Sequence, residues 1–209
     1  MGKKLLLIGG GGHCHSVLDA IINSGAYEEI GIIDNIDSSY LGVSVVGNDD
    51  DIPALLQAGW TDAFITVGSV GDTKIRRRLY DMVKMQGLSI PTIIDPTAII
   101  GKCVKIEEGV FVGKRAVINT GSIIGSCAII NTGAIIEHDC EIGAFSHISP
   151  GTTLCGQVKV GEDSHVGAAS VVIQLIEIGD KSLIGAGSVV VKNIPDNSKA
   201  YGNPCKVVE

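Results

Sequence analysis

The residues with the clearest potential for chemistry are the adjacent pair His138 and Asp139, preceded by Glu137. A histidine has an unperturbed pKa of about 6.5, so its neutral imidazole can act as a general base at neutral pH. Side chains of adjacent residues on a straight strand point to opposite sides. Asp139 can therefore contact His138 only if the chain bends between them. The alternative is that His138 is a solvated surface histidine.

A second candidate site is the glycine run Gly9–Gly12 near the N-terminus. It follows an apolar segment, 4–8, and precedes a helical pattern over 13–23, so the helix would begin directly after the glycines. The first peptide N–H groups of a helix attract anions such as phosphate. Asp34 ends the next apolar segment, where an acid commonly contacts a ribose or a polar ring edge. Cys14 replaces the third glycine of a dinucleotide fingerprint, and a flexible turn without a ligand is the alternative.

Strands and helices alternate in this half of the chain. We expect strands over 4–8, 30–33 and 63–67 and helices over 13–23, 50–56 and 74–86. Such alternation predicts a parallel sheet of the nucleotide-binding α/β type. Its ligand crevice lies at the carboxyl ends of the strands, where the glycine run, Asp34 and Gly68 are placed.

A repeat of six residues runs through the second half. Residues 100–195 divide into sixteen hexads without insertion, and each hexad opens with Ile, Val or Leu. The fifth position holds a small residue or valine in all hexads except those containing Ile176 and Ile194. A period of six fits neither an α-helix nor an ordinary hairpin. It predicts a parallel β-helix in which each hexad forms one strand and one corner, and three hexads form one triangular coil.

The repeat also predicts where each hexad position points. The opening and fifth residues should fill the interior, and the second position, often Gly or Asn, should lie near the bend. Gly and Asn tolerate the positive φ that tight corners can require. The hand of the coil does not follow from the period, because ordinary β-crossovers are right-handed.

Two further histidines, His147 and His165, are three hexads apart. One coil separates them, so their rings should stack on one face, with His165 a surface or interface residue. A zinc site shared across a trimer, as in the β-helical carbonic anhydrases, is the alternative. Those enzymes show two histidines five positions apart, a pair that this sequence lacks, so we expect no metal.

The amino-acid composition and net charge exclude some classes of function. The 209 residues divide into expected domains 1–92 and 93–209, with 16 basic and 23 acidic residues and a net charge of −7. The one basic run, Arg76–Arg78, is expected on a solvated helix face, so neither nucleic acid nor an anionic membrane is expected as a partner. The six cysteines form no disulfide pattern, and Cys140 should pack inward as a small hydrophobe. No segment has the length of a membrane span or a signal peptide, and we expect a cytoplasmic protein.

The motifs, taken in order, resemble one family over essentially the whole chain. The segments LLIGGGGHCHSVLDAI, GIIDN and FITVGSV are followed by the hexads and then by KNIPDNSKAYGNPCKVV. This order is similar to that of the hexapeptide-repeat sugar O- and N-acetyltransferases of the UDP-bacillosamine and sialic acid pathways. The resemblance implies a Rossmann-like N-terminal domain that holds a sugar nucleotide, UDP-linked in that family. It also implies a left-handed β-helix that binds acetyl-CoA between neighbouring subunits of a homotrimer.

The resemblance also assigns roles to residues. His138 matches the catalytic base and Asp139 the acid that raises its basicity, where family members often carry Glu. The sugar nucleotide would be bound by Gly11, Gly12, His13, Asp34, Asn35 and Gly68. Cys14 and Asn35 depart from the family pattern, which leaves the identity of the sugar or nucleotide open.

Acetyl-CoA would lie along the coils with its thioester end at His147. Backbone groups of Ala168 and Ala186, again three hexads apart, would line its groove. A backbone N–H must stabilise the tetrahedral oxyanion, and Gly156 is one candidate.

The expected reaction is direct attack of the amino group of a nucleotide-linked sugar on the thioester, with no acyl-enzyme. The alternatives are O-acetylation of a sialic acid or related glycan sugar, and a β-helix protein that acetylates nothing, either a metal-dependent hydratase or a scaffold. The glycine-rich domain favours the first reaction, because a free sugar gives that domain less to bind.

Overall fold

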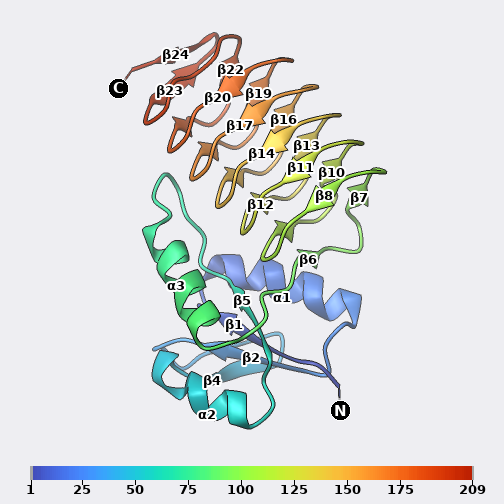
Figure 1. Cartoon of the computed structure of the whole chain (residues 1–209), viewed down its shortest axis with the longest axis vertical. Helices are drawn as coiled ribbons and strands as arrows, with labels where there is room; N and C mark the ends of the chain where they lie inside the picture. The colour runs from blue at the N-terminus through green and yellow to red at the C-terminus, as the bar shows by residue number, and fades with distance from the viewer. Residues whose placement is uncertain (1, 209) are drawn as a thin grey trace. The chain divides into compact units, whose positions relative to one another are not determined.

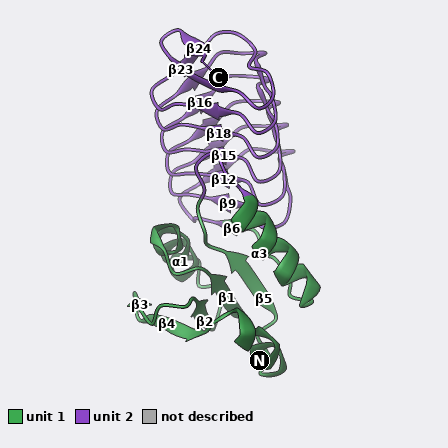
Figure 2. Cartoon of the chain, turned by 90° about the vertical axis from the view of Figure 1, so that its left-hand side faces the viewer, with its two compact units in different colours: residues 1–68, 74–93 green, residues 69–73, 94–209 purple. Residues whose placement is uncertain are grey.

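The computed structural model describes residues 2–208, which fall into two compact units (Figure 2). The first unit contains the chain up to Gly68 together with Lys74–Ile93. The second contains Ser69–Thr73 together with the chain from Ile94 onward. The short segment 69–73 therefore belongs structurally to the unit formed by the second half of the sequence. In the described part of the chain, no helix is both long enough and apolar enough to cross a membrane.

The first unit is an α/β fold with a five-stranded sheet in the order β3-β4-β2-β1-β5 (Figure 2). Its strand β1 is mostly apolar, and Leu5, Leu6 and Leu7 are completely buried. The sheet is parallel except for β3, a short edge strand that sequence patterning missed together with β4. The elements are β1 (Lys4–Ile8), α1 (Gly12–Ser24), β2 (Glu29–Ile33), β3 (Ser39–Tyr40), β4 (Val43–Gly47), η1 (Asp49–Asp51), α2 (Ile52–Gln57), β5 (Asp62–Ile65) and α3 (Lys74–Met85).

The second unit is a left-handed parallel β-helix built from two-residue strands and closed by a short hairpin. Its successive coils are visible in Figure 1. The strands are β6 (Ile93–Ile94), β7 (Ile99–Ile100), β8 (Lys105–Ile106), β9 (Phe111–Val112), β10 (Val117–Ile118), β11 (Ile123–Ile124), β12 (Ile129–Ile130), β13 (Ile135–Ile136), β14 (Glu141–Ile142), β15 (His147–Ile148), β16 (Thr153–Leu154), β17 (Lys159–Val160), β18 (His165–Val166), β19 (Val171–Val172), β20 (Glu177–Ile178), β21 (Leu183–Ile184), β22 (Val189–Val190), β23 (Lys199–Gly202) and β24 (Cys205–Val207).

The pairing register confirms three hexads per coil. Ile118 pairs with Ile136, and Ile136 pairs with Leu154, so each step advances the chain by three hexads. The opening residue is the second residue of each strand, and it points inward with the fifth residue of the hexad. These two positions form one apolar core that runs through the unit. Burying this ladder of aliphatic side chains is the main source of stability for strands too short to be stable alone.

The expected place of the tight bend was wrong by two positions. Positive φ occurs at the fourth hexad position, as at Asp139 (58°) and Lys181 (53°), and not at the second. Glycine at the second position serves close packing between coils. A Cβ added at Gly143 would lie 2.5 Å from the backbone nitrogen of Glu162 in the next coil.

Outward-facing residues give the three sides of the prism different characters. The apolar face, formed by β7, β10, β13, β16, β19 and β22, presents Ile99, Val117, Ile135, Thr153, Val171 and Val189. The charged face, formed by β8, β11, β14, β17 and β20, presents Lys105, Ile123, Glu141, Lys159 and Glu177. The covered face, formed by β9, β12, β15, β18 and β21, presents Phe111, Ile129, His147, His165 and Leu183.

The segment 69–73 lies on the covered face. The Ser69 carbonyl accepts a hydrogen bond from His147 Nδ1 at 3.1 Å, and Thr73 Oγ1 donates to Asp163 Oδ1 at 2.5 Å. Between them, Gly71 packs so closely on Leu183 that a Cβ would lie 2.8 Å from its Cδ1. This short segment therefore buries part of a sheet that the hexad pattern alone leaves exposed.

We predict that Gly143→Ala destabilises the protein by about 1–3 kcal/mol, because the added methyl must push two coil backbones apart. Gly151→Ala is the control: its φ is 67°, yet nothing lies within 4 Å of the added Cβ. That variant should cost about 1 kcal/mol, the penalty for an L-residue at positive φ without a steric clash. Urea unfolding followed by circular dichroism measures both, and equal losses would contradict close coil packing as the reason for glycine at the second position.

Candidate functional site

His138 and Asp139 lie at the corner that joins β13 to β14. The left-handed conformation of Asp139 (φ 58°) supplies the bend that a contact between adjacent side chains requires. As a result, His138 Nδ1 and Asp139 Oδ2 are 2.9 Å apart. The sequence left open whether this pair could meet, and the structure brings the two side chains together.

The His138–Asp139 contact controls orientation more than stability. Their side chains are 52% and 56% exposed, so solvent screens the attraction and the pair stabilises the fold little. A carboxylate can only accept a hydrogen bond, so the neutral imidazole facing it carries its proton on Nδ1. The lone pair of Nε2 is then directed away from Asp139 and can accept a proton.

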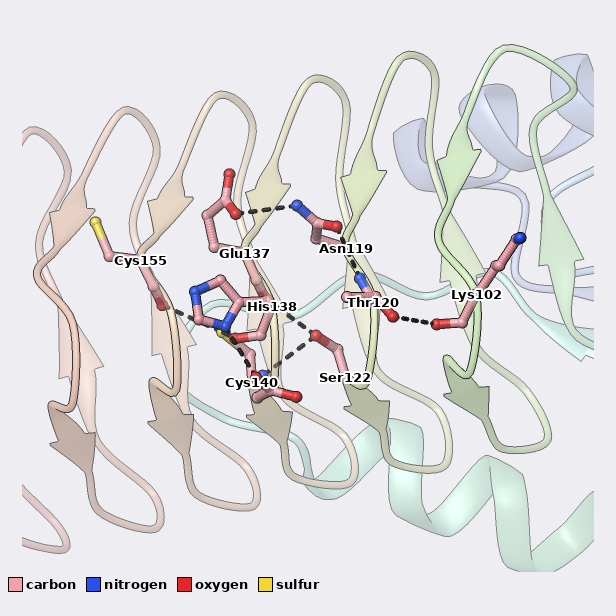
Figure 3. A network of polar contacts seen from close by, with 9 residues as sticks. Lys102, Asn119, Thr120, Ser122, Glu137, His138, Cys140 and Cys155 are labelled. Carbon is pink, nitrogen blue, oxygen red and sulfur yellow. Dashed lines mark hydrogen bonds and ion pairs between the residues drawn. The ribbon is translucent and has the colours of Figure 1, made fainter.

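Contacts with both adjacent coils hold the backbone around this histidine (Figure 3). Glu137 Oε2 accepts from Asn119 Nδ2 at 3.0 Å, and the Cys140 N–H donates to Ser122 Oγ at 3.2 Å. On the other side, Cys140 Sγ donates to the Cys155 carbonyl at 3.2 Å. Burial raises the pKa of the Cys140 thiol to about 11, so this sulfur keeps its proton. Cys140 thus packs inward as expected and also joins two coils.

Gly156 occupies the equivalent corner one coil after His138, and the imidazole lies against it. A Cβ at Gly156 would be 2.5 Å from His138 Nε2. No acceptor in the described part of the chain pairs with the Gly156 N–H. The candidate oxyanion donor and the candidate base are therefore neighbours.

His147 lies away from this corner, on the covered face. Asn131 Oδ1 accepts from Thr132 N at 2.7 Å, which directs the Asn131 amide nitrogen toward His147 Nε2 at 3.1 Å. His147 Nε2 is then an acceptor, and Nδ1–H donates to the Ser69 carbonyl. Both ring nitrogens are engaged within the chain, and no contact of His147 in the described structure reaches His138.

His165 was expected to be a surface or interface residue. The surface alternative is wrong, because only 8% of His165 is exposed. Its ring is 4.8 Å from that of His147, one coil away as expected, but meets it edge-on at 89° rather than face to face. Nε2 lies 3.2 Å from Ser149 Oγ, and burial lowers the pKa of His165. Among the described residues, no group of three potential ligands is arranged to hold a metal ion.

Ala168 and Ala186 are stacked one coil apart, and the Gly187 N–H donates to the Ala168 carbonyl at 2.8 Å. Both lie at corners that follow the covered face and lead into the apolar face. His138 lies at a corner that leads out of the apolar face. The two sets of residues thus border opposite edges of the apolar face, and one chain does not bring them together.

In the first unit, Asp34 anchors the glycine turn. Its Oδ2 accepts from the Gly10 N–H at 2.6 Å and its Oδ1 from the Ile36 N–H at 3.1 Å. These hydrogen bonds, that of Gly10 foremost, hold the pKa of the Asp34 carboxyl below its usual range. Asp34 therefore shapes the turn, while the neighbouring Asn35 is exposed to solvent.

Gly11 and Gly12 have no such structural reason to be glycine. Gly9 must be glycine, because its φ is 104° and an added Cβ would lie 2.6 Å from Val67 Cγ2. At Gly11 and Gly12, φ is not left-handed and nothing lies within 4 Å of an added Cβ. They begin α1, which has no side-chain cap at its N-terminus and no acidic residue in its first turn. This helix start is open on the side of the two glycines.

His13 follows the glycines, and its side chain lies beside Gly68, 3.5 Å from an added Cβ there. Burial, with a smaller effect from the Arg76 charge, lowers the pKa of His13 to about 4, so its imidazole is neutral at pH 7. Arg76 was expected on a solvated face but is only 3% exposed. The helical spacing of Arg76 with the buried Leu79 and Val83 is the signal that identifies it as inward-facing.

Comparisons with known proteins agree with these features. Residues 4–83 match the PglD N-terminal domain, and residues 103–136 and 157–192 match the hexapeptide repeat of succinyl-transferase. PerB from Caulobacter crescentus was solved with CoA and GDP-perosamine, and it is 37% identical to this chain with a TM-score of 0.93. The match covers 99% of this chain and 97% of PerB. The acetyltransferase domain of PglB from Neisseria gonorrhoeae, solved with acetyl coenzyme A, is 33% identical with a TM-score of 0.93, and both chains are covered completely.

These similarities extend over both units and include the α/β domain as well as the repeats. Identities of 37% and 33% over almost the full length of both proteins exclude a likeness of fold alone. The chain therefore belongs to the hexapeptide-repeat sugar acetyltransferase family that carries a PglD-type N-terminal domain.

Proposed function

We propose that this acetyltransferase moves the acetyl group of acetyl-CoA to the amino group of a sugar linked to a nucleoside diphosphate, with His138 as the general base. One observation carries the assignment of the base: His138 Nε2 is left free by the bond to Asp139 and lies against Gly156. The relatives support the substrates, since PerB was solved with CoA and GDP-perosamine and the PglB domain with acetyl coenzyme A.

The reaction requires two proton transfers, the first from the attacking nitrogen to His138 and the second from His138 to the leaving thiolate. The sugar nitrogen attacks the thioester carbonyl carbon, a C–N bond forms, and the proton lost by nitrogen passes to His138 Nε2. The N–H of Gly156 would stabilise the oxyanion of the tetrahedral intermediate. The C–S bond then breaks, and the imidazolium returns its proton to the leaving CoA thiolate. Asp139 keeps the ring in the required tautomer throughout, and no acyl-enzyme forms.

The nucleotide would be held by the first unit. Gly11 and Gly12 leave space at the uncapped start of α1, where backbone N–H groups favour a diphosphate. Asn35 and Gly68 border the open edge of the sheet, and Asp34 acts through the turn it anchors. UDP is the nucleotide implied by sequence resemblance, while PerB was solved with a GDP-sugar, so thermal-shift screening should include UDP-, GDP- and CMP-sugars.

The acetyl-CoA site would be shared between subunits of a homotrimer. Of the three faces, one carries charges and one is buried by segment 69–73, whereas the apolar face exposes Ile99 by 64% and Ile135 by 37%. Packing apolar faces around a threefold axis would bring the His138 corner of one chain beside the Ala168–Ala186 column of the next. In that arrangement His147 would act on the site indirectly, through Asn131 and segment 69–73. Light scattering should then give three times the chain mass of 21.7 kDa.

We predict that His138→Ala lowers kcat by about 10²–10⁴, the usual cost of removing a general base. The Kd for CoA should change less than about twofold, because the base acts on the acceptor nitrogen. Asp139→Asn should lower kcat by a smaller factor, since an amide can still contact the ring but no longer enforces one tautomer. Thiol release with acetyl-CoA and an amino-sugar nucleotide measures kcat, and calorimetry measures the Kd. A His138→Ala enzyme with wild-type kcat would exclude this base.

We also predict that Gly12→Val weakens nucleotide-sugar binding about tenfold or more, because the side chain would enter the space beside the helix N-terminus. Ser16→Val is the matched control, exposed one turn later on the same helix. Both variants should melt close to the wild type, since nothing in the chain occupies the space at Gly12. Titration calorimetry with a nucleotide sugar distinguishes them, and equal affinities would place the diphosphate elsewhere.

A further inference from the structure

Two glycines lie one coil to either side of the His138–Asp139 pair. Gly121 is three hexads before Asp139, and an added Cβ there would collide with Asp139 Oδ1. Gly156 is three hexads after His138, and an added Cβ would lie 2.5 Å from Nε2 and 2.7 Å from Cε1 of the imidazole. Each side chain of the pair therefore occupies the space that a neighbouring glycine leaves open.

The chain itself shows that the requirement at Gly121 is specific. Residues 118–123 read INTGSI and residues 130–135 read INTGAI, so the two hexads differ only at the fifth position. Their glycines have similar φ, 76° at Gly121 and 65° at Gly133. One coil later the first faces Asp139 and the second faces Gly151, and nothing lies within 4 Å of a Cβ at Gly133. The two glycines therefore have similar backbone conformations, and they differ in that Gly121 faces the carboxylate of Asp139.

At Gly156 too, the backbone conformation does not explain why the residue is glycine. Its φ is outside the left-handed region, and the same hexad position holds Thr120, Thr132 and Ala168 elsewhere in the β-helix. A side chain is therefore compatible with this corner. The group that would be displaced at Gly156 is the ring of His138.

We propose that Gly121 and Gly156 are positioning residues that set the geometry of the acetyl-transfer base. Gly121 leaves room for the Asp139 carboxylate to reach Nδ1, and Gly156 allows the imidazole to lie flush with the backbone N–H proposed to hold the oxyanion. This inference rests on the proposed role of His138. It adds that the spacing of three successive coils, rather than the pair alone, determines where Nε2 points.

The colliding atoms belong to the rotatable ends of side chains and not to the backbone. A methyl group at either glycine can therefore be accommodated by rotating Asp139 or His138 out of position. The expected consequence is a loss of catalysis without unfolding, in contrast to Gly143, where the neighbouring atoms are backbone. Displacing a reacting group by about 1 Å can cost as much as about 10²-fold in rate.

The test compares Gly121→Ala, Gly156→Ala and the matched control Gly133→Ala in the full-length protein. We expect kcat to fall about 10- to 100-fold in the first two variants and less than about twofold in the control. Melting temperatures of Gly121→Ala and Gly133→Ala should agree, because both place alanine at positive φ. The KM for acetyl-CoA should stay within about threefold in all three.

Long-range ¹H–¹⁵N NMR of the histidine rings gives a readout that does not depend on activity. In the wild type, His138 should show the Nδ1–H tautomer, and Gly121→Ala should shift it toward the tautomer mixture of an unpaired histidine. If Gly121→Ala leaves both the ring spectrum and kcat equal to those of Gly133→Ala, the positioning role is overturned. If the ring spectrum shifts while kcat is unchanged, the glycine positions the ring as proposed, and the base assignment fails instead.

Discussion

The spacing between successive coils is the constraint on which the rest of this structure depends. Backbone pairing between residues three hexads apart fixes each corner directly above the equivalent corner of the previous coil. Any side chain that leaves a corner must therefore share its space with the residues one coil before and after it. At residues 137–140 this produces a bent pair, His138 and Asp139, between two glycines. The same spacing aligns Asn119 with Glu137 at this edge of the prism and Ala168 with Ala186 at another.

Much of the β-helix could be predicted because its rule is local and repeats. An aliphatic residue at the start of each hexad and a small one at the fifth position suffice to identify the coil and its interior. The conformation of the corner could not be read in the same way. Asp139, Lys181 and other non-glycine residues adopt positive φ at the fourth position, so composition does not mark the bend. Glycine is instead frequent at the second position, and at these glycines the close approach of successive coils leaves no room for a side chain.

The errors about single residues share a physical cause, which is burial that the local pattern of charges and repeats does not reveal. His165 follows the repeat as an outward residue, but its face is covered by a segment from the first half of the chain. Arg76 lies in a run of charges that reads as solvated, yet the helical period places it with Leu79 and Val83 on the buried side of α3. Asp34 lies at a strand end as expected, where its carboxylate accepts a hydrogen bond from the Gly10 N–H. Its contact with a nucleotide stays a prediction. Sequence patterns therefore predict which residues lie together at one edge of a sheet better than they predict which polar atoms of those residues remain free to bind a ligand.

In the proposed trimer each site would draw on two chains, because His138 and the Ala168–Ala186 column border opposite edges of the apolar face. The role of His138 can be tested most directly by replacing its side chain with a free base. His138 is half exposed, so imidazole added to a His138→Gly enzyme can enter the space that the ring leaves. If His138 is the general base, transfer to the amino-sugar nucleotide should rise with imidazole concentration and recover a measurable part of the lost rate. Full binding of both substrates with no recovery of rate at any imidazole concentration would contradict a general-base role for His138.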